Sequence, residues 1–180
     1  YQLMVSKKII DEWLSAPFDQ ETQDSVKALV KNREKLEDAF YKSLEFGTGG
    51  LRGIMGVGTN RINKYTLGKS TQGLSKFLKK KFPAEKIKVV VAYDCRNNSK
   101  FFAKIVADIF TANNIHCYLF SDLRPTPELS FAVRHLKCHC GVVLTASHNP
   151  PEYNGYKVYG RDGGQLVPPD DKNLINEIEK

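Results

Sequence analysis

The sequence of 180 residues has little of several features that would place it in a special class of protein. It contains one tryptophan, two methionines, eight prolines and 13 glycines, which excludes a collagen-like or mucin-like chain. No apolar run approaches the roughly 18 residues that span a bilayer, and no charged-then-apolar leader opens the chain. Hydrophobic residues make up 41%, enough for the core of one globular domain. We therefore expect a soluble protein with no membrane partner.

Two catalytic motifs are also missing. The G-x-S-x-G elbow of α/β-hydrolases does not occur, and neither does the G-x-x-x-x-G-K-[ST] phosphate loop. Their absence argues against a lipase-like esterase and against a P-loop NTPase. The chain also lacks internal repeats and low-complexity segments.

Cysteine is scarce and falls in the second half of the chain, at Cys95, Cys117, Cys138 and Cys140. A CxC pair with two scattered partners is not the disulfide framework of a small secreted domain. The spacing fits no zinc-finger or zinc-ribbon pattern, and the apolar neighbours suit packed thiols. We expect buried, reduced cysteines in a cytoplasmic protein, with a zinc site as the less favoured alternative.

The formal net charge of +7 comes entirely from the first half, where residues 1–90 hold 17 Lys and Arg against 10 Asp and Glu. A basic surface can bind nucleic acid or small anions. No nucleic-acid motif accompanies the charge, so solvated lysines on a helix face are the simpler interpretation. Nucleic acid is therefore not an expected partner.

Helical periodicity dominates the first part of the chain. Apolar residues recur at a near-helical period over 22–46, with charges on the other face. This pattern predicts one long helix. The stretch Gly47–Gly53 that follows is too rich in glycine for a helix and predicts a loop that enters a strand. Asn63 or Thr66 can cap a second helix, which Pro83 terminates.

Strand-like and helix-like segments alternate through the second half. Short runs of β-branched and apolar residues lie at 87–93, 117–120, 141–145 and 156–159. Helical patterns lie at 101–111, 128–136 and 173–180. Apolar strands joined by helices form parallel sheets whose two faces are both covered. The sequence therefore predicts an α/β fold of three layers, α/β/α, around a mainly parallel mixed sheet.

The residues that directly follow each strand are candidates for a site, because ligands collect at the carboxyl ends of strands in open α/β sheets. Three such stretches lie at 94–99, 123–127 and 146–151. In the third, Ser147 stands where the strand ends, and His148 is a nearby base that could take its proton. Arg52 and Lys157 could hold a phosphate. An isolated Ser-His pair is more often part of an ordinary turn, so both interpretations stand at this point.

Four stretches carry a resemblance to a known family. They are Phe46–Gly53 (FGTGGLRG), Tyr93–Arg96 (YDCR), Pro125–Pro127 (PTP) and Thr145–Lys157 (TASHNPPEYNGYK). The last closely resembles the phosphoserine loop of the α-D-phosphohexomutase family, the phosphoglucomutases and phosphomannomutases. The sequences of these stretches are most similar to those of the branch with bacterial phosphoglucomutases, phosphopentomutases and glucose-1,6-bisphosphate synthases. The resemblance covers about residues 40 to 170 in the family's order.

The resemblance implies a role for each matching residue. Ser147 would carry a phosphoryl group, donate it to a sugar monophosphate and take one back from the bisphosphorylated sugar. His148 and Lys157 match positions near the reacting hydroxyls, and Arg52 matches the arginine that steadies the phosphoserine. Further substrate- or phosphate-binding positions are expected at Thr48, Gly49, Arg96 and Asn149.

The resemblance also implies Mg²⁺ as a cofactor and a sugar 1,6-bisphosphate as an activator. In the family, the seryl phosphate and three aspartates of a D-G-D-G-D-R loop hold the metal. That loop does not occur in this chain, and Asp170-Asp171 is no substitute. Ser147, through its phosphate, would be the one metal ligand from this chain.

These observations predict a domain organisation and three hypotheses of function. Residues 1–40 are expected to form a helical extension, and residues 41–180 the first domain of a phosphohexomutase whose later domains are absent. The favoured hypothesis is this mutase domain, acting on sugar phosphates and inactive without the remaining domains of the polypeptide. A phosphopentomutase or a glucose-1,6-bisphosphate synthase is the alternative within the family. A non-catalytic phosphate- or partner-binding module and a nucleic-acid-binding protein are the alternatives from other classes.

Overall fold

The computed structural model describes residues 6–47 and 49–180. Along the chain, its helices and strands are α1 (Lys7–Trp13), α2 (Gln20–Val30), α3 (Arg33–Phe40), β1 (Gly50–Ile54), α4 (Lys64–Lys81), β2 (Lys88–Tyr93), α5 (Ser99–Ala112), β3 (His116–Leu119), α6 (Thr126–His135), β4 (Cys140–Leu144), β5 (Tyr153–Tyr159) and α7 (Asp170–Glu179). The alternation of strands and helices after α4 follows the sequence prediction, and β5 is longer than the predicted run.

The five strands form one mixed sheet in the order β1-β5-β4-β2-β3. Strands β2, β3 and β4 are parallel to one another, and β5 is antiparallel to both of its neighbours, β4 and β1. The carboxyl ends of β2, β3 and β4 therefore lie at one edge of the sheet. The loops that follow these three strands meet there, as the sequence predicts.

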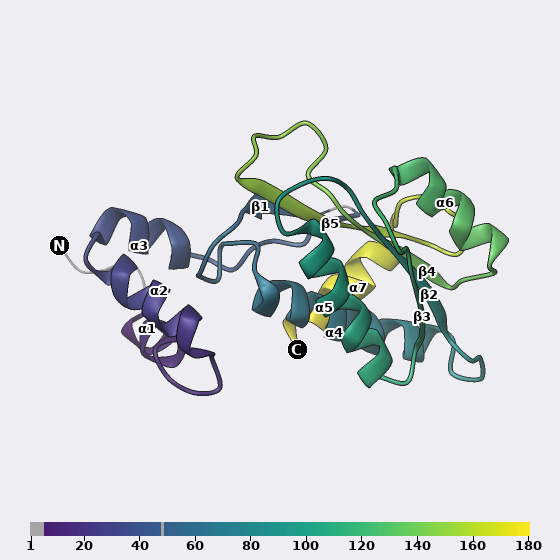
Figure 1. Cartoon of the computed structure of the whole chain (residues 1–180). Coiled ribbons are helices and arrows are strands. Elements are labelled where there is room, and N and C mark those ends of the chain that lie inside the picture. The colour runs from purple at the N-terminus through teal and green to yellow at the C-terminus, as the bar shows by residue number, and fades with distance from the viewer. Residues whose placement is uncertain (1–5, 48) are drawn as a thin grey trace.

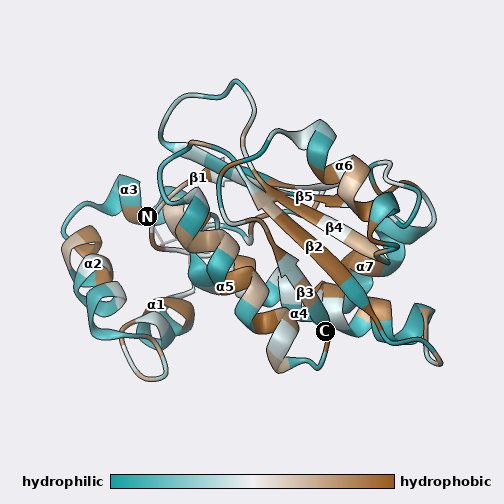
Figure 2. Ribbon diagram, turned by 45° about the vertical axis from the view of Figure 1, so that its right-hand side comes forward, coloured by the Kyte–Doolittle hydropathy of each residue, from teal (hydrophilic) through white to brown (hydrophobic). Residues whose placement is uncertain are grey.

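Helices cover both faces of the sheet (Figures 1 and 2). On one face, α4, α5 and α7 contribute Leu74, Phe102 and Leu174 to a large buried cluster. On the other face, α6 packs Leu129 and Val133 into a smaller cluster. The fold is thus the predicted three-layer α/β/α arrangement. Its central strands β2 and β4 are almost wholly buried because helices cover both sides.

The first three helices form a group to one side of the sheet (Figure 1). Trp13, Val26 and Phe40, one from each helix, bury their side chains in a third apolar cluster. The prediction of one helix over 22–46 is wrong, because the helix is interrupted between α2 and α3. Asn32 lies in an extended conformation there, and its side chain accepts the backbone N–H of Lys35 at 3.1 Å. Asparagine side chains offer this alternative to helix continuation.

The basic cluster of α4 has partners within the fold. Lys80 pairs with Glu177 at 2.7 Å, and Lys81 pairs with Asp170, so part of the positive charge binds α4 to α7. Both ion pairs leave the lysine side chain well exposed to solvent. Each therefore contributes little to stability by itself, and most of the α4–α7 contact depends on apolar packing.

The cysteines differ in their exposure. Cys138 and Cys140 are buried, as predicted, and Cys117 is partly buried. Burial raises the pKa of Cys138 to about 11 and that of Cys117 to about 12, which keeps these thiols protonated near neutral pH. The prediction is wrong for Cys95, which is exposed because it lies in the loop beyond the end of β2.

In the described part of the chain, no helix is both long and apolar enough to cross a membrane.

Candidate active site

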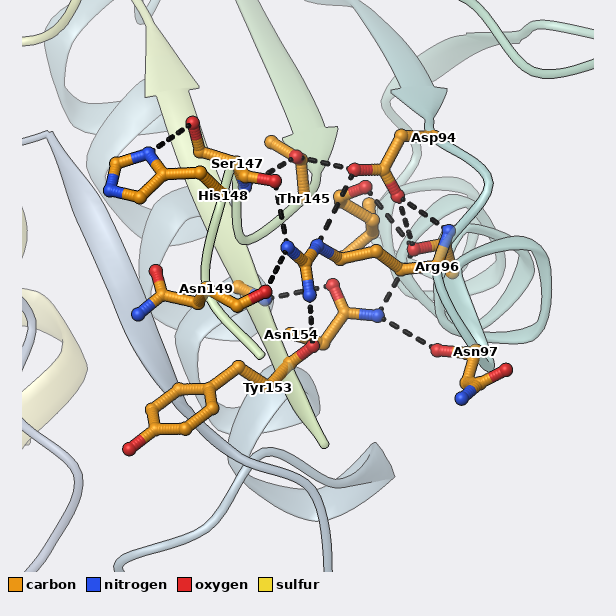
Figure 3. A network of polar contacts seen from close by, with 12 residues as sticks. Asp94, Arg96, Asn97, Thr145, Ser147, His148, Asn149, Tyr153 and Asn154 are labelled. Carbon is orange, nitrogen blue, oxygen red and sulfur yellow. Dashed lines mark hydrogen bonds and ion pairs between the residues drawn. The ribbon is translucent and has the colours of Figure 1, made fainter. Parts of the chain in front are cut away.

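Ser147 lies in the loop between β4 and β5, at the carboxyl edge of the sheet (Figure 3). The residue is exposed, and its backbone has a φ of 55°, in the left-handed region. L-amino acids with a Cβ atom rarely adopt this conformation, and instances cluster at functional sites. The strand exit thus presents the hydroxyl to solvent on a turned backbone.

A chain of hydrogen bonds holds the amide of Ser147. Its N–H donates to the hydroxyl of Thr145 at 3.0 Å, and that hydroxyl donates to Asp94 Oδ2 at 2.5 Å. Asp94 Oδ1 also accepts the backbone N–H of Arg96 at 3.0 Å and the hydroxyl of Ser99 at 2.9 Å. The ends of β2 and β4 are therefore joined through one carboxylate beneath the serine.

Arg96 binds the loop from below through main-chain carbonyl groups (Figure 3). Its Nη2 donates to the carbonyl oxygens of Ser147 at 2.7 Å and Asn149 at 2.6 Å. Its Nη1 donates to the carbonyl oxygens of Pro150 at 3.0 Å and Tyr153 at 3.1 Å. A guanidinium carries two N–H groups on each terminal nitrogen, so all four are occupied. This differs from the expectation that Arg96 binds substrate phosphate.

The side chains of Ser147 and His148 face each other although they are adjacent in sequence. The distance between Ser147 Oγ and His148 Nδ1 is 3.3 Å. Both residues are exposed, so water and a substrate can reach the pair. An imidazole in this position can accept the hydroxyl proton when the oxygen becomes a nucleophile.

Arg52 on β1 and Lys157 on β5 lie on one face of the sheet. Their neighbours Leu51 and Tyr156 are paired across the two strands and belong to the large buried cluster. Side chains alternate between the two faces of a strand, so both cations project to the opposite face. Within the described residues, neither side chain makes a hydrogen bond or an ion pair. Lys157 is half-buried in this unpaired state.

Two glycines lie opposite these cations in the pairing of β1 and β5. Gly155 is paired with Arg52, and Gly50 with Lys157. A Cβ atom on Gly155 would lie 2.5 Å from the carbonyl oxygen of Thr145, and one on Gly50 would lie 2.1 Å from a carbonyl oxygen of β5. Any side chain here would collide with the backbone. The close approach of the neighbouring backbones thus requires glycine opposite each cation.

The other predicted binding residues have different environments. Gly49 has a φ of 79°, and its carbonyl oxygen accepts the N–H of Val158 at 2.8 Å, which fixes the glycine-rich loop to β5. The side-chain oxygen of Asn149 is buried and lacks a hydrogen-bond partner among the described residues. Thr48 lies outside the described residues.

Sequence reasoning placed Asp94, Ser99, Thr145 and Asn154 in candidate stretches but gave none of them a role, and the structure shows that they support the loop. Asn154 is fully buried, and its Nδ2 donates to the Asn97 carbonyl and the Ser99 hydroxyl, both at 3.0 Å. The sequence signal that could have pointed to Asp94 and Thr145 is their position directly after β2 and β4. These side chains act on the loop and do not face the solvent side of Ser147.

The described part of the chain does not by itself bring together the ligands of a Mg²⁺ site. Among residues 6–47 and 49–180, no three His, Cys, Asp or Glu side chains come together as metal ligands. Both oxygens of Asp94, the carboxylate beneath Ser147, already accept hydrogen bonds. A phosphate on Ser147 would be a hard oxygen ligand of the type that Mg²⁺ prefers, so further ligands would have to come from elsewhere.

Comparison with known proteins agrees with the fold and the loops. A human phosphopentomutase is 41% identical over 178 residues, covering 94% of this chain and 29% of the human protein. A phosphoglucomutase of Staphylococcus epidermidis ATCC 12228 is 44% identical over 147 residues, covering 82% of this chain and 27% of its own. The chain therefore spans less than a third of the length of these relatives.

A solved structure from Thermus thermophilus, of a protein assigned as a phosphomannomutase, has 32% identity to this chain. It superposes with a TM-score of 0.70 over 76% of this chain and 30% of its own. Residues 43–180 match the family model described as phosphoglucomutase/phosphomannomutase, alpha/beta/alpha domain I. The strand order, the serine loop and these matches agree, and the chain belongs to the phosphoglucomutase/phosphomannomutase family, of which it contains domain I.

Proposed function

We propose that this chain is the phosphoryl-carrying domain of a mutase that interconverts sugar 1-phosphates and 6-phosphates. The observation that carries the proposal is the exposed Ser147, whose hydroxyl lies 3.3 Å from the imidazole of His148. Two cations without partners in the described chain, Arg52 and Lys157, lie on one face of the adjoining strands. A nucleophile with a base and free cations suits phosphoryl transfer, in which positioning and charge neutralisation supply most of the catalysis.

The transfer conserves atoms and charge without a further reactant. In the first transfer, a hydroxyl oxygen of a sugar monophosphate bonds to the phosphorus carried by Ser147 as the bond between that phosphorus and the serine oxygen breaks, and the proton of the sugar hydroxyl ends on the serine oxygen by way of His148 Nδ1. In the second transfer, the oxygen of Ser147 bonds to the other phosphorus of the resulting sugar 1,6-bisphosphate as the bond between that phosphorus and its sugar oxygen breaks, and the serine proton passes through His148 Nδ1 to that sugar oxygen. A sugar 1,6-bisphosphate that leaves between the two transfers leaves Ser147 without its phosphoryl group, and its rebinding would restore that group, so it would serve as the activator.

The proposed partners follow from the same chemistry. Arg52 would hold the transferred phosphate bidentately, and Lys157 would neutralise charge beside the reacting hydroxyl. Gly49 and Asn149 would border the phosphate site. Mg²⁺, held in part by the phosphate on Ser147, would supply charge neutralisation at the transferred group. We place the protein in the cytoplasm, where free thiols stay reduced.

The proposed domain boundaries are 1–40 for a helical extension and 41–180 for domain I. The separate apolar cluster of α1, α2 and α3 supports this division. Because the relatives are more than three times as long as their match to this chain, the remaining metal and sugar contacts would come from other domains. We expect no mutase turnover from residues 1–180 alone, and robust turnover in a coupled assay would contradict this.

A pentose phosphate is the second candidate substrate. The similarity to human phosphopentomutase extends over 178 residues, whereas that to the staphylococcal phosphoglucomutase extends over 147. Because it covers 94% of this chain, the phosphopentomutase match includes most of the helical extension. Comparison of kcat/KM for glucose 1-phosphate and ribose 1-phosphate in the complete polypeptide distinguishes the two substrates.

Intact-mass spectrometry tests the phosphoryl carrier directly. We expect one phosphate on the complete polypeptide after incubation with glucose 1,6-bisphosphate, and none on its Ser147→Ala variant. Ser121→Ala is the matched control, because Ser121 is an exposed serine beyond β3 at the same sheet edge. Phosphate that persists in Ser147→Ala, or that is never taken up by the native protein, would contradict the proposed function.

A further inference from the structure

Arg96 is nearly enclosed by the loop that carries Ser147. Its side chain is 11% exposed, and its four terminal N–H groups all donate to main-chain carbonyl groups of residues 147–153. Its Nε is buried and lies 3.8 Å from Asp94 Oδ2, beyond hydrogen-bond distance but close enough for charge compensation. The four terminal N–H groups are therefore all engaged inside the protein, and no terminal donor is left for a ligand.

The backbone of Ser147 needs such a restraint. Its φ of 55° is disfavoured for serine, so the loop would relax to an ordinary conformation if it were released. Thr145 holds the N–H side of the residue, and Arg96 holds its carbonyl side. With both peptide groups fixed, the direction of the Cα–Cβ bond is fixed, and so is the region of space that the hydroxyl can reach.

We propose that Arg96 is a positioning residue that holds the Ser147 loop in its reactive conformation, and that it does not bind the substrate phosphate. That this conformation is the reactive one rests on the proposed function, whereas the restraint itself is a property of the folded loop. It assigns to Arg96 a role different from that of Arg52 and Lys157, whose side chains are unpaired.

The geometry requires a guanidinium. The four carbonyl oxygens form two pairs, and each pair is bound by one terminal nitrogen of a planar group. A lysine has one nitrogen with three N–H groups and cannot span both pairs. Arg96→Lys therefore keeps the charge and loses part of the restraint on the loop. Arg96→Met approximates the length of the side chain and loses the whole restraint, because it has no N–H groups.

Amide hydrogen exchange tests the proposal without depending on catalysis. In Arg96→Met we expect the amides of Ser147, Asn149 and Tyr153 to exchange about tenfold faster or more, while the core amide of Val142 changes much less. Arg96→Lys should lie between the two. Arg124→Met is the matched control, since it removes an arginine whose ion pair with Glu128 lies on the surface. In this variant the amides of the Ser147 loop should exchange as in the native protein.

The outcomes separate this inference from the proposed function. Unchanged exchange in the loop of Arg96→Met, or equal acceleration throughout the protein, would overturn the positioning role. Unchanged exchange together with lost phosphoryl uptake would instead indicate that Arg96 contacts phosphate. A loosened loop in Arg96→Met, combined with no phosphoryl uptake by the native protein, would refute the proposed function and leave the restraint by Arg96 established.

Discussion

Ser147 has a backbone conformation that favours glycine, although its side chain is the candidate nucleophile. A glycine there would relieve the strain and remove the hydroxyl. The serine is therefore retained at a cost to stability, which is typical of residues at functional sites. Two hydrogen bonds maintain the conformation against this cost: the N–H of Ser147 donates to the Thr145 hydroxyl, and Arg96 donates to the Ser147 carbonyl oxygen.

This strain predicts an order of stability for two variants. Ser147→Gly should be more stable to urea than Ser147→Ala by about 1 kcal/mol, because alanine keeps the Cβ atom that opposes a positive φ. Both variants lack the hydroxyl, so each serves as the control for its loss. Urea unfolding followed by circular dichroism measures the difference. Equal stability, or a more stable alanine variant, would contradict the argument from strain.

At the scale of the elements, the cap of α4 also binds the loop that joins β1 to α4. Asn63 Oδ1 accepts the N–H groups of Tyr65 and Thr66, and the hydroxyl of Thr66 accepts the N–H of Asn63, which completes a capping box. The sequence left Asn63 and Thr66 as alternative caps, and the structure uses both. Asn63 Nδ2 also donates to the carbonyl oxygens of Gly56 and Gly58 at 2.9 and 3.0 Å.

These additional contacts predict unequal costs for two helix caps. Asn63→Ala should lower the free energy of unfolding by about 2 kcal/mol, since it removes the cap and leaves two loop carbonyls without their donor. Asn32→Ala at the start of α3 is the matched control, because the cap contact of Asn32 is a single bond to Lys35 N–H, and it should cost about 1 kcal/mol or less. Equal effects in urea unfolding would show that the loop contacts of Asn63 contribute nothing.

At the scale of the molecule, the N-terminal helices dock on α4 through Asp19. This carboxylate accepts a hydrogen bond from Tyr65 and lies 2.7 Å from the ammonium group of Lys64. The Lys64 ammonium, followed by the Tyr65 hydroxyl, holds the pKa of Asp19 well below its usual range. Trp13, the single tryptophan, packs against Phe18 and the ring of Tyr65 at the same junction.

The lowered pKa predicts a docking contact that weakens in acid. Because Asp19 has a lower pKa folded than unfolded, its stabilising contribution is complete above the unfolded value of about 3.9 and is lost as pH falls below it. Fluorescence of Trp13 should therefore report loosening of the helices as pH falls from 5 to about 2. In Asp19→Asn this acid dependence should shrink, and it should remain in the control Asp24→Asn, which lies in α2, the helix that Asp19 caps. Identical pH profiles for the native protein and Asp19→Asn would contradict the prediction.

Local patterns were sufficient for most of the fold, whereas the serine loop was identified by the resemblance of Thr145–Lys157 to a known family. The β-branched run that became β2 and the small apolar run that became β4 predict strands because each is buried on both faces. Ser147, His148, Arg52 and Lys157 were identified from their motifs and their positions beside strands. Periodicity failed between α2 and α3, because Asn32 interrupts the helix without interrupting the apolar pattern.

The sequence by itself determined the order of the elements from α4 onward, the three-layer class and the candidate residues Ser147, His148, Arg52 and Lys157, since each depends on neighbours close in the chain. The tertiary structure alone decided the role of Arg96 and the unpaired state of Lys157. Arg96 reaches carbonyl groups more than 50 residues away, and the register of β1 on β5 places glycines opposite both cations. Contacts over such separations depend on strand register and on the turn after β4, which no local pattern in the sequence specifies.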